Sequence, residues 1–101
     1  MTLHLETINF QKFEALENFV KNLTNKRFGK LKFITTINVY IKKTEDAMVP
    51  WKAEIELRPI KGAPIFAESE SINYLTAFSQ SVTRAQRQVE KYQDKRFKNR
   101  A

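Results

Sequence analysis

The sequence has no cysteine, only two glycines, three prolines and one histidine, and no long apolar run in its 101 residues. The absence of cysteine excludes disulfides and thiolate zinc sites. No segment approaches the roughly 18 apolar residues of a membrane-spanning helix. The first residues lack both the cationic start and the apolar run of a signal peptide. We therefore expect a cytoplasmic protein without a membrane partner.

Residues that could carry catalysis are equally scarce. His4 is the only histidine and falls on an outward position of an expected strand. Glu54 and Glu56 point to one face of a strand, as do Glu68 and Glu70, but an open sheet face offers no cleft for acid–base chemistry. The chain has no phosphate-binding loop, dinucleotide fingerprint or metal-ligand spacing. We predict that the protein is not an enzyme and has no cofactor, metal or small-molecule substrate.

The last quarter of the chain predicts a long amphipathic helix from Tyr74 to Lys98. Neither proline nor glycine interrupts it, and apolar residues recur at alternating steps of three and four: Leu75, Phe78, Val82, Ala85, Val89 and Tyr92. A cationic ladder runs two residues off that stripe: Arg84, Arg87, Lys91, Lys95 and Lys98. At ~1.5 Å per residue the helix is about 37 Å long. We expect its last two turns, Lys91 to Arg100, to project as a cationic arm.

The remaining patterns predict one helix and four strands. Leu3 and Leu5 alternate with polar residues in a short strand. A helix is expected over Phe10–Phe28, with Gly29 as its left-handed cap; its apolar stripe is Phe13, Leu16, Val20 and Leu23. Period-two alternation predicts strands over 33–42, 51–58 and 65–70, the first burying its odd residues. Ser71 or Asn73 can cap the final helix.

This order predicts an α+β fold, a β-α-β-β-β-α two-layer sandwich forming a single domain over residues 1–101. The three consecutive strands should form an antiparallel meander within a four-stranded sheet, with both helices packed on one face. We expect the sheet to bury Leu3, Leu5, Ile37, Val39, Ile41, Trp51, Ala53, Ile55 and Leu57 against the helices. The other face should stay in solvent, with glutamates balanced by Lys52 and Arg58.

The net charge of +7 is unevenly distributed along the chain. Residues 21–43 carry seven basic side chains and no acidic one, and residues 82–101 carry a net +5. An acidic middle segment, residues 44–81, separates these two basic blocks with a net −3. Clustered basic residues favour a polyanionic partner, with nucleic acid first and an acidic membrane surface second.

Three local patterns also carry a resemblance to a known family. Glu14-Ala15-Leu16 through Val20-Lys21, Trp51-Lys52-Ala53-Glu54-Ile55, and Arg84 to Tyr92 stand in the order and spacing of its first helix, third strand and second helix. The chain thus resembles the short ribosome hibernation-promoting factors, also called ribosome-associated inhibitors or sigma-54 modulation proteins. The resemblance covers nearly all of the chain.

The resemblance implies a translation inhibitor that binds the small ribosomal subunit, in the channel for mRNA and tRNA, and silences idle ribosomes. Its partner would be ribosomal RNA. Because the chain stops at Ala101, we expect no second dimerisation domain and a monomer off the ribosome. Joining the resemblance to the charge pattern, we expect the RNA-binding residues to be Lys21, Lys26, Arg27, Lys30, Arg84, Arg87, Lys91, Lys95, Arg96 and Lys98.

Three alternatives stay open. A double-stranded-RNA-binding module also pairs helices with a sheet, although it normally begins with its helix. A protein-interaction module could dock an acidic partner, and a small enzyme is the third possibility. Ribonuclease treatment separates the first two classes, because an RNA binder should leave the high-molecular-weight fraction while a protein docker should remain with its partner.

Overall fold

The structure, a computed structural model, describes the backbone of residues 1–97 and the side chains through Lys95. Its elements, in chain order, are β1 (Thr2–Ile8), α1 (Glu14–Phe28), β2 (Ile34–Lys43), β3 (Trp51–Pro59), β4 (Ile65–Ser71) and α2 (Tyr74–Phe97). The sheet order is β1-β2-β3-β4. The β1 strand pairs parallel to β2, and the other neighbours pair antiparallel. The predicted α+β order and meander are confirmed.

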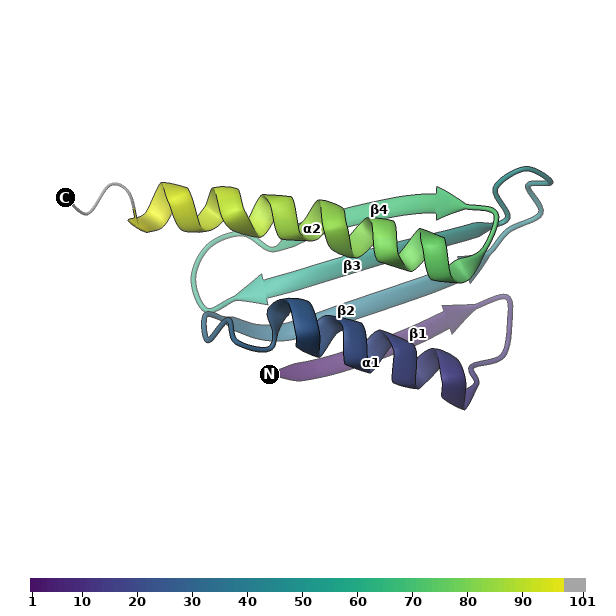
Figure 1. Ribbon diagram of the computed structural model, residues 1–101, viewed down its shortest axis with the longest axis horizontal. Helices are drawn as coiled ribbons and strands as arrows, with labels where there is room; N and C mark the ends of the chain where they lie inside the picture. The colour runs from purple at the N-terminus through teal and green to yellow at the C-terminus, as the bar shows by residue number, and fades with distance from the viewer. Residues whose placement is uncertain (98–101) are drawn as a thin grey trace.

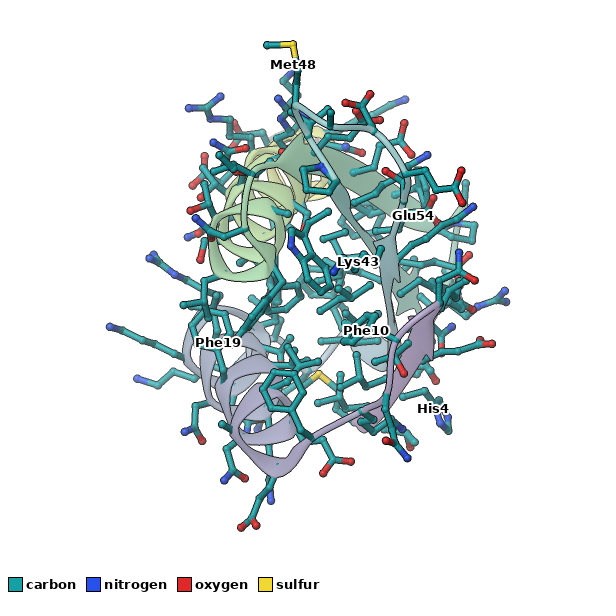
Figure 2. The ribbon with its side chains drawn as sticks, turned by 90° about the vertical axis from the view of Figure 1, so that its right-hand side faces the viewer. His4, Phe10, Phe19, Lys43, Met48 and Glu54 are labelled. Atoms are coloured by element: carbon teal, nitrogen blue, oxygen red, sulfur yellow. The ribbon has the colours of Figure 1, made fainter. Side chains whose placement is uncertain are left out.

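Both helices cover one face of the sheet, with α1 over the β1 side and α2 over β3 and β4 (Figure 1). Seen end-on, His4 and Glu54 project from the opposite face, whereas Phe10 and Phe19 lie on the helical side (Figure 2). The parallel β1–β2 pair needs a crossover connection, which α1 provides. The two-layer prediction is therefore confirmed.

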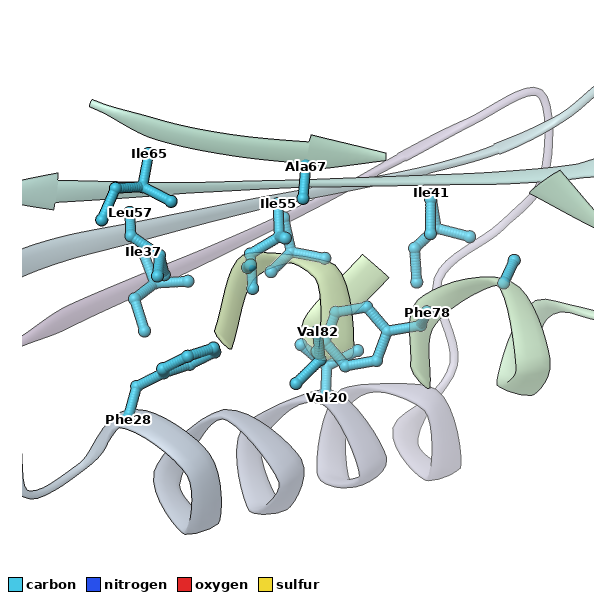
Figure 3. Packing of buried hydrophobic residues seen from close by; sticks show 14 of the residues in the cluster. Val20, Phe28, Ile37, Ile41, Ile55, Leu57, Ile65, Ala67, Phe78 and Val82 are labelled. Carbon is cyan, nitrogen blue, oxygen red and sulfur yellow. The ribbon is translucent and has the colours of Figure 1, made fainter. Parts of the chain in front are cut away.

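The core fills the space between the two layers (Figure 3). Its fully buried side chains include Leu16, Val20, Phe28, Ile37, Val39, Ile41, Ile55, Leu57, Phe78 and Val82. Leu3, Leu5 and Trp51 are only partly buried around this core, because each lies at the margin of the sheet. Leu75 was expected on the buried stripe of α2 but is 45% exposed. That part of the prediction is wrong, since Tyr74 packs against the core in the first turn of α2 and Leu75 is turned away from it.

The burial pattern of β2 departs from the prediction at its start. Ile37, Val39 and Ile41 are buried as expected, but Thr35 is exposed and Ile34 is buried in its place. The pairing of β2 with β3 has a register irregularity between Ile34 and Thr36. Such an irregularity shifts the alternation by one residue, so the prediction that every odd residue faces the core is wrong at this end.

The first helix begins at Glu14 rather than at Phe10. Phe13 occupies the N-cap with an extended backbone (φ −140°, ψ 155°), and its side chain is 39% exposed. Phe10 instead packs edge-on against Trp51, with 4.9 Å between ring centroids. This contact with Trp51 keeps Phe10 outside the helix, so α1 is shorter than predicted.

Gly29 follows α1 as predicted, but its backbone is right-handed (φ −61°, ψ −25°), so the left-handed cap is wrong. Its N–H donates to the carbonyl oxygen of Asn25 at 2.9 Å. A Cβ atom at this position would collide with that same carbonyl oxygen. Glycine is therefore suited to this site by the close backbone approach, not by a positive φ.

The ends of α2 are tied to the domain. The side-chain oxygen of Asn73 accepts a hydrogen bond from the Thr76 N–H at 2.7 Å, which confirms the predicted cap. Near the other end, Tyr92 stacks on Phe33 with ring centroids 5.1 Å apart, and its hydroxyl donates to the Lys61 carbonyl at 2.9 Å. The helix does outrun the sheet (Figure 1).

The prediction that a projecting cationic arm begins at Lys91 is therefore wrong at its start, because Tyr92 still packs on the domain. The remainder of the predicted arm, Lys98 to Arg100, lies outside the described residues. Among the described residues, neither helix is long and apolar enough to cross a membrane.

Candidate polyanion-binding surface

The cationic ladder of α2 lies on the surface of the helical layer. Arg84, Arg87, Lys91 and Lys95 are all exposed along the helix. For Arg96 the structure describes only the helical backbone, and Lys98 lies outside the described residues. Because these cations stand on one continuous helix, their relative positions are fixed by helical geometry over several turns.

Arg84 and the uncharged Gln88 fix the direction in which this ladder faces. The Arg84 guanidinium donates to the Glu68 carbonyl at 2.6 Å, and the Gln88 amide donates to the Phe66 carbonyl at 2.7 Å. Both acceptors belong to β4, the edge strand beneath α2. Lys91 and Lys95 lie about two and three turns further along the same side of the helix. The ladder thus follows the β4 flank of α2.

These two hydrogen bonds were not expected from the sequence. Arg84 was predicted to serve RNA binding, yet one of its nitrogens is engaged by the protein itself. The available signal was the polar pair at positions 84 and 88, one helical turn apart. It could be interpreted only once β4 was known to be an edge strand.

The cations of α1 fall into two groups. Lys26 and Arg27 are exposed in the last turn and Lys30 follows directly, so all three stand at the end of the helix where carbonyl dipoles favour positive charge. Lys21 is elsewhere, in a hollow between α1 and β1 that Leu3 and Lys12 also line. The structure therefore separates Lys21 from the α2 ladder, because α1 and α2 cover opposite halves of the sheet.

Lys52 and Arg58 pair with glutamates on the open face of the sheet, as predicted. The Lys52 ammonium lies 3.4 Å from the Glu68 carboxylate on β4 and 3.5 Å from Glu54 on its own strand. The hydrogen bond and charge of Glu68 raise the pKa of Lys52, against an opposing effect of burial, and the Glu54 charge adds a lesser contribution in the same direction as Glu68. Such solvent-exposed pairs contribute little to stability.

Glu56 has a more ordered environment on the same face. Its carboxylate accepts hydrogen bonds from the Asn38 amide at 2.9 Å and from the Arg58 guanidinium at 3.0 Å. The Asn38 hydrogen bond, and then that of Arg58, lower the pKa of Glu56 below its usual value. No group of three or more potential ligands capable of holding a metal ion occurs among the described residues.

Trp51 does not form an open stacking platform. Its ring meets Phe10 and Tyr74 edge-on, with centroids 4.9 and 5.4 Å away. The Lys43 ammonium lies 5.4 Å from the centroid of the same ring, a cation–π arrangement. The indole therefore anchors the end of the sheet to α2 and is largely occupied by protein contacts.

The fold and its surface define a small β-α-β-β-β-α protein with a helical layer that presents clustered cations. The chain belongs to the sigma 54 modulation protein / S30EA ribosomal protein family, whose family model matches residues 3–97. This finding confirms the resemblance from the sequence patterns. No curated protein matches the chain.

Solved structures share this fold, among them the following two. The N-terminal domain of Thermus thermophilus Protein Y has 17% identity and a TM-score of 0.70, with 90% of this chain and 94% of that chain covered. A ribosomal subunit interface protein from Coxiella burnetii has 15% identity and a TM-score of 0.73, with 92% and 98% covered. At these identities the similarity establishes the shared fold.

Proposed function

We propose that the protein binds the small ribosomal subunit through the helical layer and inhibits translation on idle ribosomes. Membership of the S30EA ribosomal protein family supports a ribosomal partner. The description of the Coxiella burnetii neighbour as a ribosomal subunit interface protein points the same way. The observation that carries the proposal is the exposed row of Arg87, Lys91 and Lys95 on one rigid helix.

The chemistry of this row suits ribosomal RNA. Cations that displace condensed counterions from a phosphate backbone give strong, salt-sensitive and sequence-tolerant binding. Structured RNA is recognised largely through shape and phosphate, which favours a rigid array of cations over base-reading side chains. Lys26, Arg27 and Lys30 add a second exposed cluster at the end of α1.

Arg87 and Lys91 are the best residues for a test of this proposal. Both are exposed, and neither makes the contact with β4 that ties Arg84 to the fold. We expect R87Q/K91Q to weaken binding to purified small subunits and to reduce the slope of log affinity against log salt by about one to two units. Binding is measured by co-sedimentation at several salt concentrations.

The matched control is K42Q/R58Q. It likewise removes two positive charges from exposed residues. Lys42 points to the same side of β2 as Asn38, and Arg58 points to the same side of β3 as Glu56, so both positions belong to the open face of the sheet, opposite the helices. We expect this control to leave the affinity and the salt slope almost unchanged. If the control loses binding while R87Q/K91Q retains it, the helical layer is not the binding surface.

Inhibition is tested separately, by adding the protein to a cell-free translation reaction. The unmodified protein should reduce peptide synthesis, and R87Q/K91Q should require a higher concentration for the same effect. Binding without any reduction of synthesis would contradict the inhibitory part of the proposal and leave the binding part intact.

A further inference from the structure

The two edge strands of the sheet differ in the hydrogen bonds that their backbones make with side chains. At the β4 edge, Arg84 and Gln88 donate hydrogen bonds to backbone carbonyls of the strand. Alternate residues of the other edge strand, β1, also direct their backbone groups away from the sheet. Within the described part of the chain, no hydrogen bond between side chain and backbone was found at β1, in contrast to β4.

A hollow of about 390 Å³ lies beside this edge, between β1 and α1. Leu3 and Leu5, both half-buried, contribute apolar surface together with Val20. Lys12 and Lys21 line the same hollow and are exposed, with Glu17 as its one acidic residue. The edge thus combines backbone groups available for pairing, apolar side chains at alternate positions, and two ammonium groups.

We propose that β1 binds an extended acidic peptide as an additional strand of the sheet. Backbone hydrogen bonds to the edge provide affinity in this mode of recognition, and pockets for alternate side chains provide specificity. Apolar side chains of the peptide would rest against Leu3 and Leu5. Lys12 and Lys21 lie on the same, helical side of the sheet, so carboxylates at the remaining positions on that side of the peptide would pair with them, which makes the charge of the peptide complementary to the hollow.

The charges argue against a second copy of this chain as the occupant. Pairing two β1 strands about a two-fold axis would bring the hollows of both copies, and therefore their Lys12 and Lys21 side chains, to one interface. Each hollow contains two lysines and one glutamate, so two positive net charges would meet at this interface, which disfavours association. The acidic peptide removes that repulsion and adds attraction.

This surface is distinct from the α2 ladder, because β1 and β4 are opposite edges of the sheet (Figure 1). It assigns Lys21, which the sequence grouped with the RNA-binding residues, to a peptide site. The inference does not depend on the proposed function.

The probe is an acetylated and amidated seven-residue peptide, Val-Thr-Glu-Thr-Val-Thr-Glu, which places its valines and glutamates on one side of the added strand and its threonines on the other. A titration followed by amide NMR should shift the resonances of residues 2–8 most strongly. Two further peptides carry N-methyl groups on alternate backbone nitrogens, one on the valines and glutamates and the other on the threonines. Because only one edge of an added strand faces β1, one of these peptides should bind at least about tenfold more weakly and the other almost normally.

The charge requirement is tested with K12E/K21E, for which we expect the glutamate peptide to bind roughly tenfold more weakly. The matched control K26E/K30E makes the same charge change at the end of α1 and should retain binding. A peptide of the same sequence with lysine in place of each glutamate should bind the unmodified protein poorly.

Several results would overturn the inference. They are equal binding of both N-methylated peptides, shifts centred on β4 or α2, or equal losses in K12E/K21E and its control. Concentration-dependent dimerisation of the free protein, with protection of the β1 amides, would place a second copy at this edge in place of the peptide. Binding of RNA with shifts at residues 2–8 would likewise exclude the peptide assignment.

Discussion

Replacing Phe78 by alanine tests how the helical layer is held to the sheet. The Phe78 side chain is fully buried, and its ring meets that of Phe19 on α1 edge-on with 5.9 Å between centroids. It therefore joins α2 both to the core and to the other helix. Removing a buried phenylalanine side chain costs about 3–5 kcal/mol, through lost transfer free energy and the cavity that remains.

This loss is large against the roughly 5–15 kcal/mol that stabilises a domain of this kind. With a urea m-value of about 1–3 kcal/mol per molar, the unfolding midpoint of F78A should fall by at least about 1 M. The fluorescence of Trp51, the only tryptophan, reports the transition because the indole packs between Phe10 and Tyr74. Most of the protein should still be folded without denaturant.

The control is L75A, one turn earlier on the same helix. Leu75 is 45% exposed, so its truncation should change the free energy of unfolding by only about 0.5–1 kcal/mol. The two variants thus separate burial from hydrophobicity, since both remove a large apolar side chain from α2. Equal shifts of the unfolding midpoint would refute the assignment of Phe78 to the core and Leu75 to the surface.

Three further substitutions have expected outcomes. V82D places an unpaired carboxylate in the core and should cost several kcal/mol or prevent folding, as circular dichroism and a thermal melt would show; a normal melt would contradict the burial of Val82. N73A removes the cap of α2 and should cost about 1 kcal/mol in urea unfolding; no loss would mean that the cap hydrogen bond is unimportant. The lowered pKa of Glu56, caused by Asn38 and Arg58, stabilises the fold at neutral pH, and this contribution is lost as the pH falls through the folded-state pKa. The melting temperatures of the unmodified protein and E56Q should therefore converge below about pH 4.3, and a constant difference from pH 7 to pH 3 would exclude this linkage.

The sequence was most informative where a single period persists over a whole element. The alternation of β3 predicted its start at Trp51, its end to within one residue, and three of its buried residues, Ala53, Ile55 and Leu57. The steps of three and four in α2 likewise identified Phe78 and Val82 as core residues. In both elements local geometry and tertiary burial agree over the central residues, and they differ only at the ends, where Leu75 is exposed and Trp51 is partly buried.

The predictions failed where a long-range contact overrides the local pattern. Phe10 fits a helical stripe, but its contact with Trp51 on β3 keeps it outside α1. The shift at Ile34 depends on how β2 pairs with β3, which no local period records. Gly29 is explained by its approach to the Asn25 carbonyl and not by the conformation that usually favours glycine after a helix.

In the candidate site, too, local periodicity predicted some features, whereas others depend on long-range contacts. Exposure of the ladder could be predicted, because cations two residues off an apolar stripe must lie away from the core. The flank that each cation occupies could not, since it depends on which strand lies beneath each helix. Arg84 therefore has an unexpected backbone partner on β4, and Lys21 lies beside β1 and away from α2.

The thickness of the domain determines which charges a polyanion on the helical side would experience. The shortest extent of the molecule is 19 Å, whereas the Debye length at physiological salt is about 8 Å. Carboxylates of the open sheet face, such as Glu54 and Glu68, are therefore separated from that polyanion by roughly two screening lengths. Their repulsion is weak there, and affinity should follow the local charge of α2 more closely than the net charge of the chain. Two variants with equal net charge, R87Q/K91Q and K42Q/R58Q, should consequently differ in affinity, whereas a polyanion that responded to net charge alone would bind them equally.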